Sequence, residues 1–243
     1  MSSVPNRSRL WVTLVWVVAA GVALILTNVL GLLAFYGWHE IAHPQRAVEL
    51  AKIVTNGSAV GISTAVASPL LILFFVGAAR MNSTDVRGYL ALTWPRGWDW
   101  AVALAAAVAL FFLELGSEQF IQDPQAQAFM TGTFLSARSD HTLAVLALAF
   151  VVLAPASEEI AFRGFFYARL EPRLGSAAAV TLTALAWACL HIQYGWASIA
   201  EIVVVGLMLG GLRWYSRSTL LPILIHAAWN VAGMIEIAML NGH

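Results

Sequence analysis

Long apolar runs recur along this chain and constrain its fold more than any other feature. One covers about residues 10–35 and another about residues 219–240. Each is long enough for a helix to cross the hydrocarbon layer of a bilayer, which takes about 20 residues. Inside that layer the backbone must satisfy its own hydrogen bonds, and a helix does so within a single segment. The sequence therefore predicts an all-α, polytopic transmembrane helical bundle.

The composition agrees with a membrane protein and excludes other classes. The chain is 60% hydrophobic and 11% charged, whereas soluble domains carry about 25% charged residues. The net charge of zero gives no basic footprint, so we expect a lipid bilayer and no nucleic acid as a partner. Cys189 is the single cysteine, so no disulfide forms within the chain. Arginine greatly outnumbers lysine, which is typical of a GC-rich bacterial genome and suggests the bacterial cytoplasmic (inner) membrane.

The apolar runs predict about seven spans, and the short turns between them allow six to eight. The expected spans are about 10–35, 57–79, 100–115, 142 to about 163, 177–194, 199–212 and 219–240. Residues 38–56 and 114–141 between them are expected to be polar loops. We divide the chain into an N-terminal region, 1–141, with the first three spans, and a helical core, 142–243, which holds the motifs described below.

The arginines predict the orientation of the bundle. Basic residues gather on the cytoplasmic side of membrane proteins. With the N-terminus inside, ten basic residues fall on the cytoplasmic side: Arg7, Arg9, Arg80, Arg87, Arg96, Arg163, Arg169, Arg173, Arg213 and Arg217. Three fall outside: Arg46, Lys52 and Arg138. We therefore expect a cytoplasmic N-terminus.

Three short motifs place polar side chains inside the apolar runs of the core. They are Glu158-Glu159-x-x-x-Arg163, Trp187-x-x-x-His191 and His226-x-x-x-Asn230. Ionisable groups are costly in a bilayer and usually face a bundle interior or a wet cavity. A spacing of four brings two side chains to one helix face. The motifs therefore predict an interior site.

The two glutamates are expected to differ in role. Arg163 follows Glu159 by four residues, so the two can pair along the helix and orient it. Glu158 is rotated by about 100° from Glu159, which leaves it the freer carboxylate. In an antiparallel hairpin that turns near Arg173, Glu158 and His191 are nearly level, and Trp187 can pack under the ring of His191.

These groups suggest the activation of water, since the sequence offers no convincing Ser or Cys nucleophile beside them. Glu158, helped by His191, would deprotonate a water that attacks a peptide carbonyl. His226 and Asn230 would donate hydrogen bonds to the developing oxyanion, each worth about 3–4 kcal/mol in known cases. We expect a membrane protein or peptide as substrate and no cofactor or metal.

The three motifs, in this order on apolar helices, resemble the CAAX protease and bacteriocin-processing (CPBP or Abi) family of intramembrane glutamic endopeptidases. That family's pattern is Glu-Glu-x-x-x-Arg, Phe-x-x-x-His and His-x-x-x-Asn/Asp. This chain departs from it at Trp187, which replaces the Phe and which we expect only to pack. The resemblance covers about residues 147–233. It implies a metal-independent enzyme with water activated by Glu158 and His191, an oxyanion hole of His226 and Asn230, and supporting roles for Glu159 and Arg163.

Other interpretations remain open from the sequence. The chain could be a non-proteolytic immunity or scaffold protein of the same fold, or a proton-coupled transporter with Glu158 and His191 as its relay. Zinc bound by Glu158, His191 and His226 is a further alternative, and His39 with His43 has a spacing that suits a metal. Gly206 and Gly210 have the small-xxx-small spacing of closely packed helices, within the chain or between chains. The oligomeric state is left open.

Overall fold

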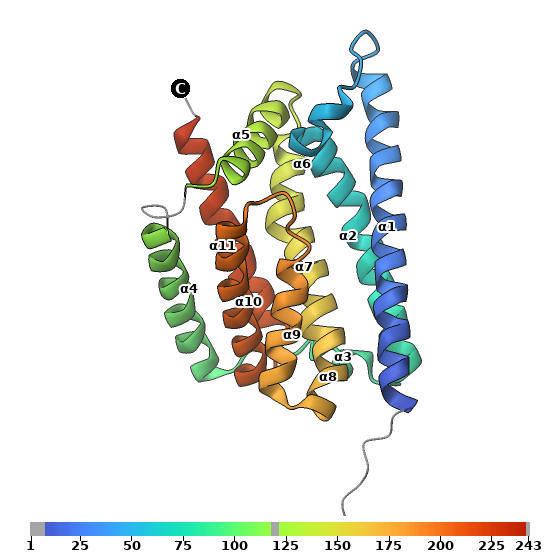
Figure 1. Cartoon of the computed structure of the whole chain (residues 1–243), viewed down its shortest axis with the longest axis vertical. Coiled ribbons are helices and arrows are strands. Elements are labelled where there is room, and N and C mark those ends of the chain that lie inside the picture. Colours follow the sequence, from blue (N-terminus) through green and yellow to red (C-terminus); the bar gives the residue numbers. More distant parts are fainter. Residues whose placement is uncertain (1–7, 118–121, 242–243) are drawn as a thin grey trace, which may run out of the picture.

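The computed structural model describes residues 8–117 and 122–241, and these contain helices and no strand. The predicted all-α bundle is therefore confirmed for the described part of the chain. Figure 1 shows a bundle of upright helices, with α1 at one edge, α4 at the other and α7 near the middle. Arg7 and Glu118, which the sequence places in flanking polar segments, lie outside the described residues.

Within the described residues, six helical segments are long and apolar enough to cross a membrane. The first three are α1 (Ser8–Ala42), α2 (Gly57–Asn82) and α4 (Gly97–Ser117). The fourth is continuous over Leu143–Leu174. It contains α6 (Leu143–Leu148), the π-helical η2 (Ala149–Leu153), α7 (Ala154–Glu159), the π-helical η3 (Ile160–Phe166) and α8 (Tyr167–Leu174). The last two are α10 (Trp196–Ser216) and α11 (Leu220–Leu240).

The expected span at 177–194 is shorter than predicted. Its helix, α9 (Ser176–Ala188), has 13 residues and is about 20 Å long at 1.5 Å per residue. That length does not cross a hydrocarbon core of about 30 Å. After Ala188 the chain leaves the helix and turns back to α10 at Trp196. The apolar pattern alone missed this, because apolar residues of the turn such as Leu190 and Ile192 continue the hydropathy of the helix past its end.

The segments expected as loops are also more helical than predicted. Within 114–141 lies α5 (Pro124–Ser139), which begins with a proline and is capped by Asp123, whose side chain accepts from two backbone N–H groups. Its buried face includes Phe129 and Phe134, so it packs onto the bundle. Within 38–56, α1 continues to Ala42 and the 3-10 helix η1 covers Leu50–Thr55.

The small residues of α10 allow α9 to approach it closely. A Cβ on Gly206 would lie 3.1 Å from the Ala184 side chain, and one on Gly210 would lie 2.8 Å from Val180. Both contacts are to α9, so this glycine pair is used inside the chain. The close approach also brings the end of α9 against α10, where the second motif begins.

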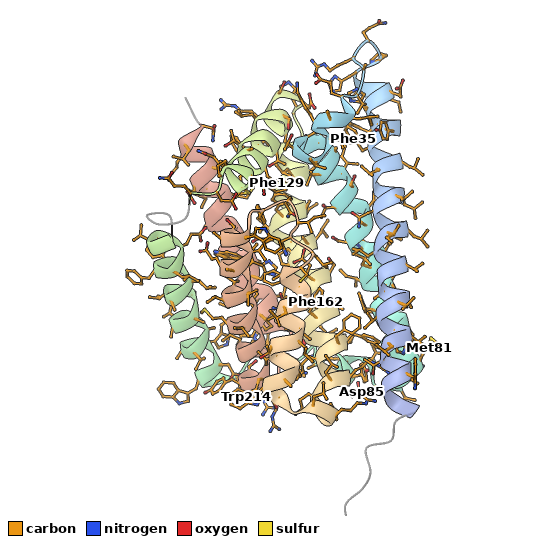
Figure 2. All side chains as sticks on the ribbon, viewed as in Figure 1. Phe35, Met81, Asp85, Phe129, Phe162 and Trp214 are labelled. Carbon is orange, nitrogen blue, oxygen red and sulfur yellow. The ribbon has the colours of Figure 1, made fainter. Side chains whose placement is uncertain are left out.

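The ends of α2, α8 and α10 lie at one end of the bundle, together with the short helix α3 (Val86–Tyr89). Figure 2 shows Met81, Asp85 and Trp214 at this end and Phe35 towards the opposite end. Six of the arginines that the topology prediction groups together lie in or next to these helix ends: Arg80, Arg87, Arg169, Arg173, Arg213 and Arg217, whereas Arg163 lies buried within its span. The cytoplasmic location of this end remains a prediction.

Candidate active site

The helix that carries Glu158 and Glu159 departs from the α-helical hydrogen-bond pattern on both sides of them. In η2 the N–H of Ala154 bonds to the carbonyl of Ala149, five residues back. In that register the carbonyl of Phe150 would pair with residue 155, which is a proline and has no N–H. The side-chain amide of Asn230 donates to the Phe150 carbonyl instead, at 2.7 Å. Local π-helical turns are often found at functional sites.

Glu159 and Arg163 form a buried ion pair, as their spacing predicts. Nη1 of Arg163 donates to Oε1 of Glu159 at 2.9 Å, and both side chains are 0% exposed. Nη2 of Arg163 donates to the carbonyl of Gly206 at 2.9 Å, which ties the motif helix to α10. The same Oε1 of Glu159 lies 3.0 Å from Nδ1 of His226 on α11. Glu159 and Arg163 together therefore link the motif helix to α10 and α11, and both side chains are fully buried.

Glu158 makes a different contact. Its Oε2 accepts a hydrogen bond of 2.6 Å from the indole N–H of Trp187. The sequence interpretation of Trp187 as a packing residue is thus incomplete: its ring does pack against His191, with centroids 4.9 Å apart, but its nitrogen also binds the carboxylate. A phenylalanine at this position has no donor for that bond.

His191 lies just beyond the end of α9, in the turn that follows Ala188, and not on a continuous helix as predicted. Its Nδ1 lies 3.0 Å from the carbonyl of Trp187. A carbonyl can only accept, so Nδ1 carries the proton, and Nε2 of the neutral ring is the acceptor. The direct hydrogen bond to Glu158 comes from Trp187, four residues before His191.

The groups on α11 also have assignable hydrogen-bond roles. Nδ1 of His226 faces the carboxylate of Glu159 and is therefore the donor in that contact. Nε2 is then an acceptor in the neutral ring and a donor only when both ring nitrogens carry a proton. Asn230 uses one amide N–H for the Phe150 carbonyl and retains a second. Both residues come one turn apart on the same face of α11, as the motif predicts.

One cavity of about 650 Å³ brings these groups together. Its lining includes Glu158, His191, His226 and Asn230, which come from three separate segments. Glu159 and Arg163 are not among its lining residues and lie behind this wall. Helices of the first 141 residues complete the cavity, with Asn28 of α1 and Ser68 of α2 among its lining residues.

The turn that carries His191 is hydrogen-bonded to the residue that caps the start of α5. Oδ2 of Asp123 accepts from the N–H of Gly195 at 2.7 Å, and Oδ1 accepts from the N–H groups of Gln125 and Ala126. Burial acts to raise the pKa of Asp123, but hydrogen bonds from the Ser198 side chain and these N–H groups outweigh it and lower the pKa below its usual value. The sequence did not reveal this contact, because it joins residues far apart in the chain.

Two further carboxylates line the cavity, and the motifs do not contain them. Glu114 of α4 accepts a hydrogen bond of 2.6 Å from the indole N–H of Trp229. Glu201 of α10 is the second. Glu114 lies at the end of an apolar run, and the sequence places it at the start of the predicted loop 114–141. The structure instead places it within the last turns of α4.

No metal-binding arrangement is found where the structure describes the chain. Within residues 8–117 and 122–241, no three His, Cys, Asp or Glu side chains are grouped so as to hold an ion. His39 and His43 do share a helix end, with rings 5.4 Å apart. Nε2 of His39 bonds to the carbonyl of Arg46, and His43 lies 3.8 Å from Asp140.

Comparison with known proteins identifies the family. Residues 140–232 match the family model described as type II CAAX prenyl endopeptidase Rce1-like. A relative from Escherichia coli, named only as an uncharacterized 24.3 kDa protein, is 30% identical over 173 residues, which cover 68% of this chain and 75% of that protein. The chain belongs to the Rce1-like family. No solved structure matches it significantly.

Membership of the Rce1-like family agrees with the resemblance seen in the motifs. The matched residues, 140–232, contain all three motifs and end just after Asn230. At the level of the family, the chain is an integral membrane protein of the CAAX-protease type, a peptidase whose site is embedded in a helical bundle.

Proposed function

We propose that this chain is an intramembrane glutamic endopeptidase that hydrolyses a peptide bond of a membrane-associated or lipid-modified protein or peptide, near the cytoplasmic face. The observation that carries the proposal is the shared cavity: Glu158, His191, His226 and Asn230 all line it. The lining thus combines a carboxylate and an imidazole that can accept a proton with two side chains that can donate hydrogen bonds. That set can activate a water and stabilise the oxyanion that its attack creates.

The roles follow from the hydrogen bonds. Oε1 of Glu158 is the carboxylate oxygen not engaged by Trp187, and Nε2 of His191 is the ring atom not engaged by the backbone. We assign these two atoms to the attacking water. Its proton passes to this pair as the oxygen bonds to the peptide carbon, and a proton returns to the leaving amine when the peptide bond breaks. The second N–H of Asn230 and Nε2–H of protonated His226 are assigned to the oxyanion.

Glu159 and Arg163 are assigned supporting roles. The carboxylate of Glu159 accepts a hydrogen bond from Nδ1 of His226 and so fixes the orientation of the ring on α11. Arg163 offsets the charge of Glu159 and links the motif helix to α10. Neither side chain reaches the cavity, so neither is expected to touch substrate.

Cleavage of membrane-anchored reporter peptides by the purified protein in liposomes tests the proposal. The wild-type protein is expected to cut at least one reporter, and Glu158→Gln is expected to lose cleavage by about 10²–10⁴-fold, the usual contribution of a general base. Cleavage that Glu158→Gln leaves unchanged would contradict the mechanism. No cleavage of any reporter by the wild-type protein would favour a non-proteolytic role.

The metal-independent chemistry is tested in the same assay. Prolonged dialysis against a strong chelator is expected to leave the rate unchanged, because the proposed base is a carboxylate and not a metal-bound hydroxide. Loss of activity that returns with Zn²⁺ would contradict this part of the proposal.

A further inference from the structure

Trp187 has more contacts with the proposed catalytic groups than any role in packing requires. Its indole N–H donates to Oε2 of Glu158 at 2.6 Å. The edge or face of its ring meets His191 at 4.9 Å and His226 at 5.2 Å between centroids, each nearly perpendicular. One side chain thus touches the carboxylate and both imidazoles of the cavity.

The indole is held so firmly that its N–H direction is fixed. Trp187 is 1% exposed. The guanidinium of Arg163 lies over its ring at 4.9 Å from the centroid, a cation–π contact. On the α10 side, a Cβ on Gly206 would come within 3.1 Å of the ring, so the backbone of α10 closes off that direction.

A fixed donor in turn fixes the acceptor. A glutamate side chain has three rotatable bonds, and in a cavity of about 650 Å³ its carboxylate has several orientations available. A hydrogen bond to one carboxylate oxygen selects among them and leaves the other oxygen directed at the water. Positioning a base within hydrogen-bond reach of the proton it removes is a condition for general base catalysis.

We propose that Trp187 is a positioning residue of the active site, whose indole N–H holds the Glu158 carboxylate in its reactive orientation while its ring sets the place of His191 and His226. The assignment of a reaction to Glu158 rests on the proposed peptidase function, whereas the Trp187–Glu158 contact does not. The tests below separate the two.

The chain offers a matched control for this contact. Trp229 also donates through its indole nitrogen to a cavity carboxylate, Glu114, with the same distance of 2.6 Å. Trp229 lies on α11 and is partly buried. The two pairs therefore share chemistry, bond length and cavity, and differ in whether the carboxylate is the proposed base.

The first test observes the contact without any substrate. The full chain is labelled with 5-fluorotryptophan, and the ¹⁹F signals of Trp187 and Trp229 are assigned from their loss in Trp187→Phe and Trp229→Phe. Glu158→Ala is expected to shift the Trp187 signal by more than its linewidth and to leave that of Trp229 in place. Glu114→Ala is expected to do the reverse. A Trp187 signal that does not respond to Glu158→Ala would overturn the proposal, whether or not the protein is a peptidase.

The second test measures the consequence for turnover. Trp187→Phe keeps an aromatic ring and removes the donor. It is expected to lower kcat about tenfold, the effect of losing one hydrogen bond to a charged group, while KM changes less than twofold. Trp229→Phe is expected to lower kcat much less. Equal losses in the two variants, or a change in KM alone, would overturn the positioning role, and melting temperatures of both variants show whether folding is affected.

Discussion

Glu158 and Glu159 are adjacent in the chain but belong to two different regions of the molecule. Glu158 lines the cavity and accepts a hydrogen bond from a neutral indole. Glu159 is 0% exposed and is bound by the guanidinium of Arg163 and by His226. One carboxylate faces space for a substrate, and the other is enclosed by charges and helices. An intramembrane carboxylate can therefore serve either catalysis or the packing of helices, and the groups that bind it decide which.

The largest expected effect concerns Glu158 and activity. Glu158→Gln keeps the size of the side chain and an acceptor for Trp187, but removes the base. Reporter cleavage is expected to fall by about 10²–10⁴-fold, with a melting temperature within a few degrees of wild type. A variant that is inactive and also strongly destabilised would contradict the division of roles between the two glutamates, because Glu158 would then have the structural role assigned to Glu159.

The second prediction reverses the pattern at Glu159. Glu159→Gln leaves Arg163 charged and buried, and removing one partner of a buried ion pair typically costs about 3–5 kcal/mol. We expect a large fall in the unfolding free energy, measured by denaturant titration in detergent micelles. Arg163→Met is expected to cost a similar amount, because it leaves Glu159 without its cation.

A double variant sharpens this prediction. Glu159→Gln with Arg163→Met removes both charges, so its cost is expected to be smaller than the sum of the two single costs. Additive costs would mean that the two side chains act independently, against the 2.9 Å contact between them.

The third prediction uses two glycines of α10 that face α9. Gly206→Ala places a methyl group 3.1 Å from the Trp187 ring, and Gly210→Ala places one 2.8 Å from Val180. Overpacking of this kind costs about 1–3 kcal/mol, so both variants are expected to melt earlier. Only Gly206→Ala is expected to lower kcat as well, because it displaces Trp187. A loss of kcat in Gly210→Ala as large as in Gly206→Ala would show that the spacing of the helices, and not Trp187, controls activity.

The smallest expected effect concerns Asp123, outside the two glutamate regions. Asp123→Asn weakens a helix cap and the bond to Gly195, and caps of this kind contribute about 1 kcal/mol. Since the pKa of Asp123 is lowered in the folded protein, the carboxylate stabilises the fold at neutral pH. That contribution is lost as the pH falls below the usual value of 3.8 towards the folded value. Melting curves of wild type and Asp123→Asn are therefore expected to converge below about pH 4. A difference that grows on acidification would contradict the cap.

The class of the fold and the identity of the polar groups could both be predicted from the sequence. Apolar runs of about 20 residues can only be helices in a bilayer, and a spacing of four fixes the Glu159–Arg163 pair along its helix without reference to anything else. The helical period also predicts that the side chains of Glu158 and Glu159 point in different directions and therefore have different roles. These features are local, so they can be read from residues that are near each other in the chain.

Tertiary structure alone decided the contacts between segments. Three hydrogen bonds of the site join residues at least 29 positions apart in the chain. They link Trp187 to Glu158, Asn230 to the carbonyl of Phe150, and the N–H of Gly195 to Asp123. The end of α9 at Ala188 could not be predicted either, because Leu190 and Ile192 continue the apolar run while the chain turns back to α10. Which of two adjacent carboxylates reaches that cavity was predicted by the helical period, but what holds it in place depended on a tryptophan from another helix.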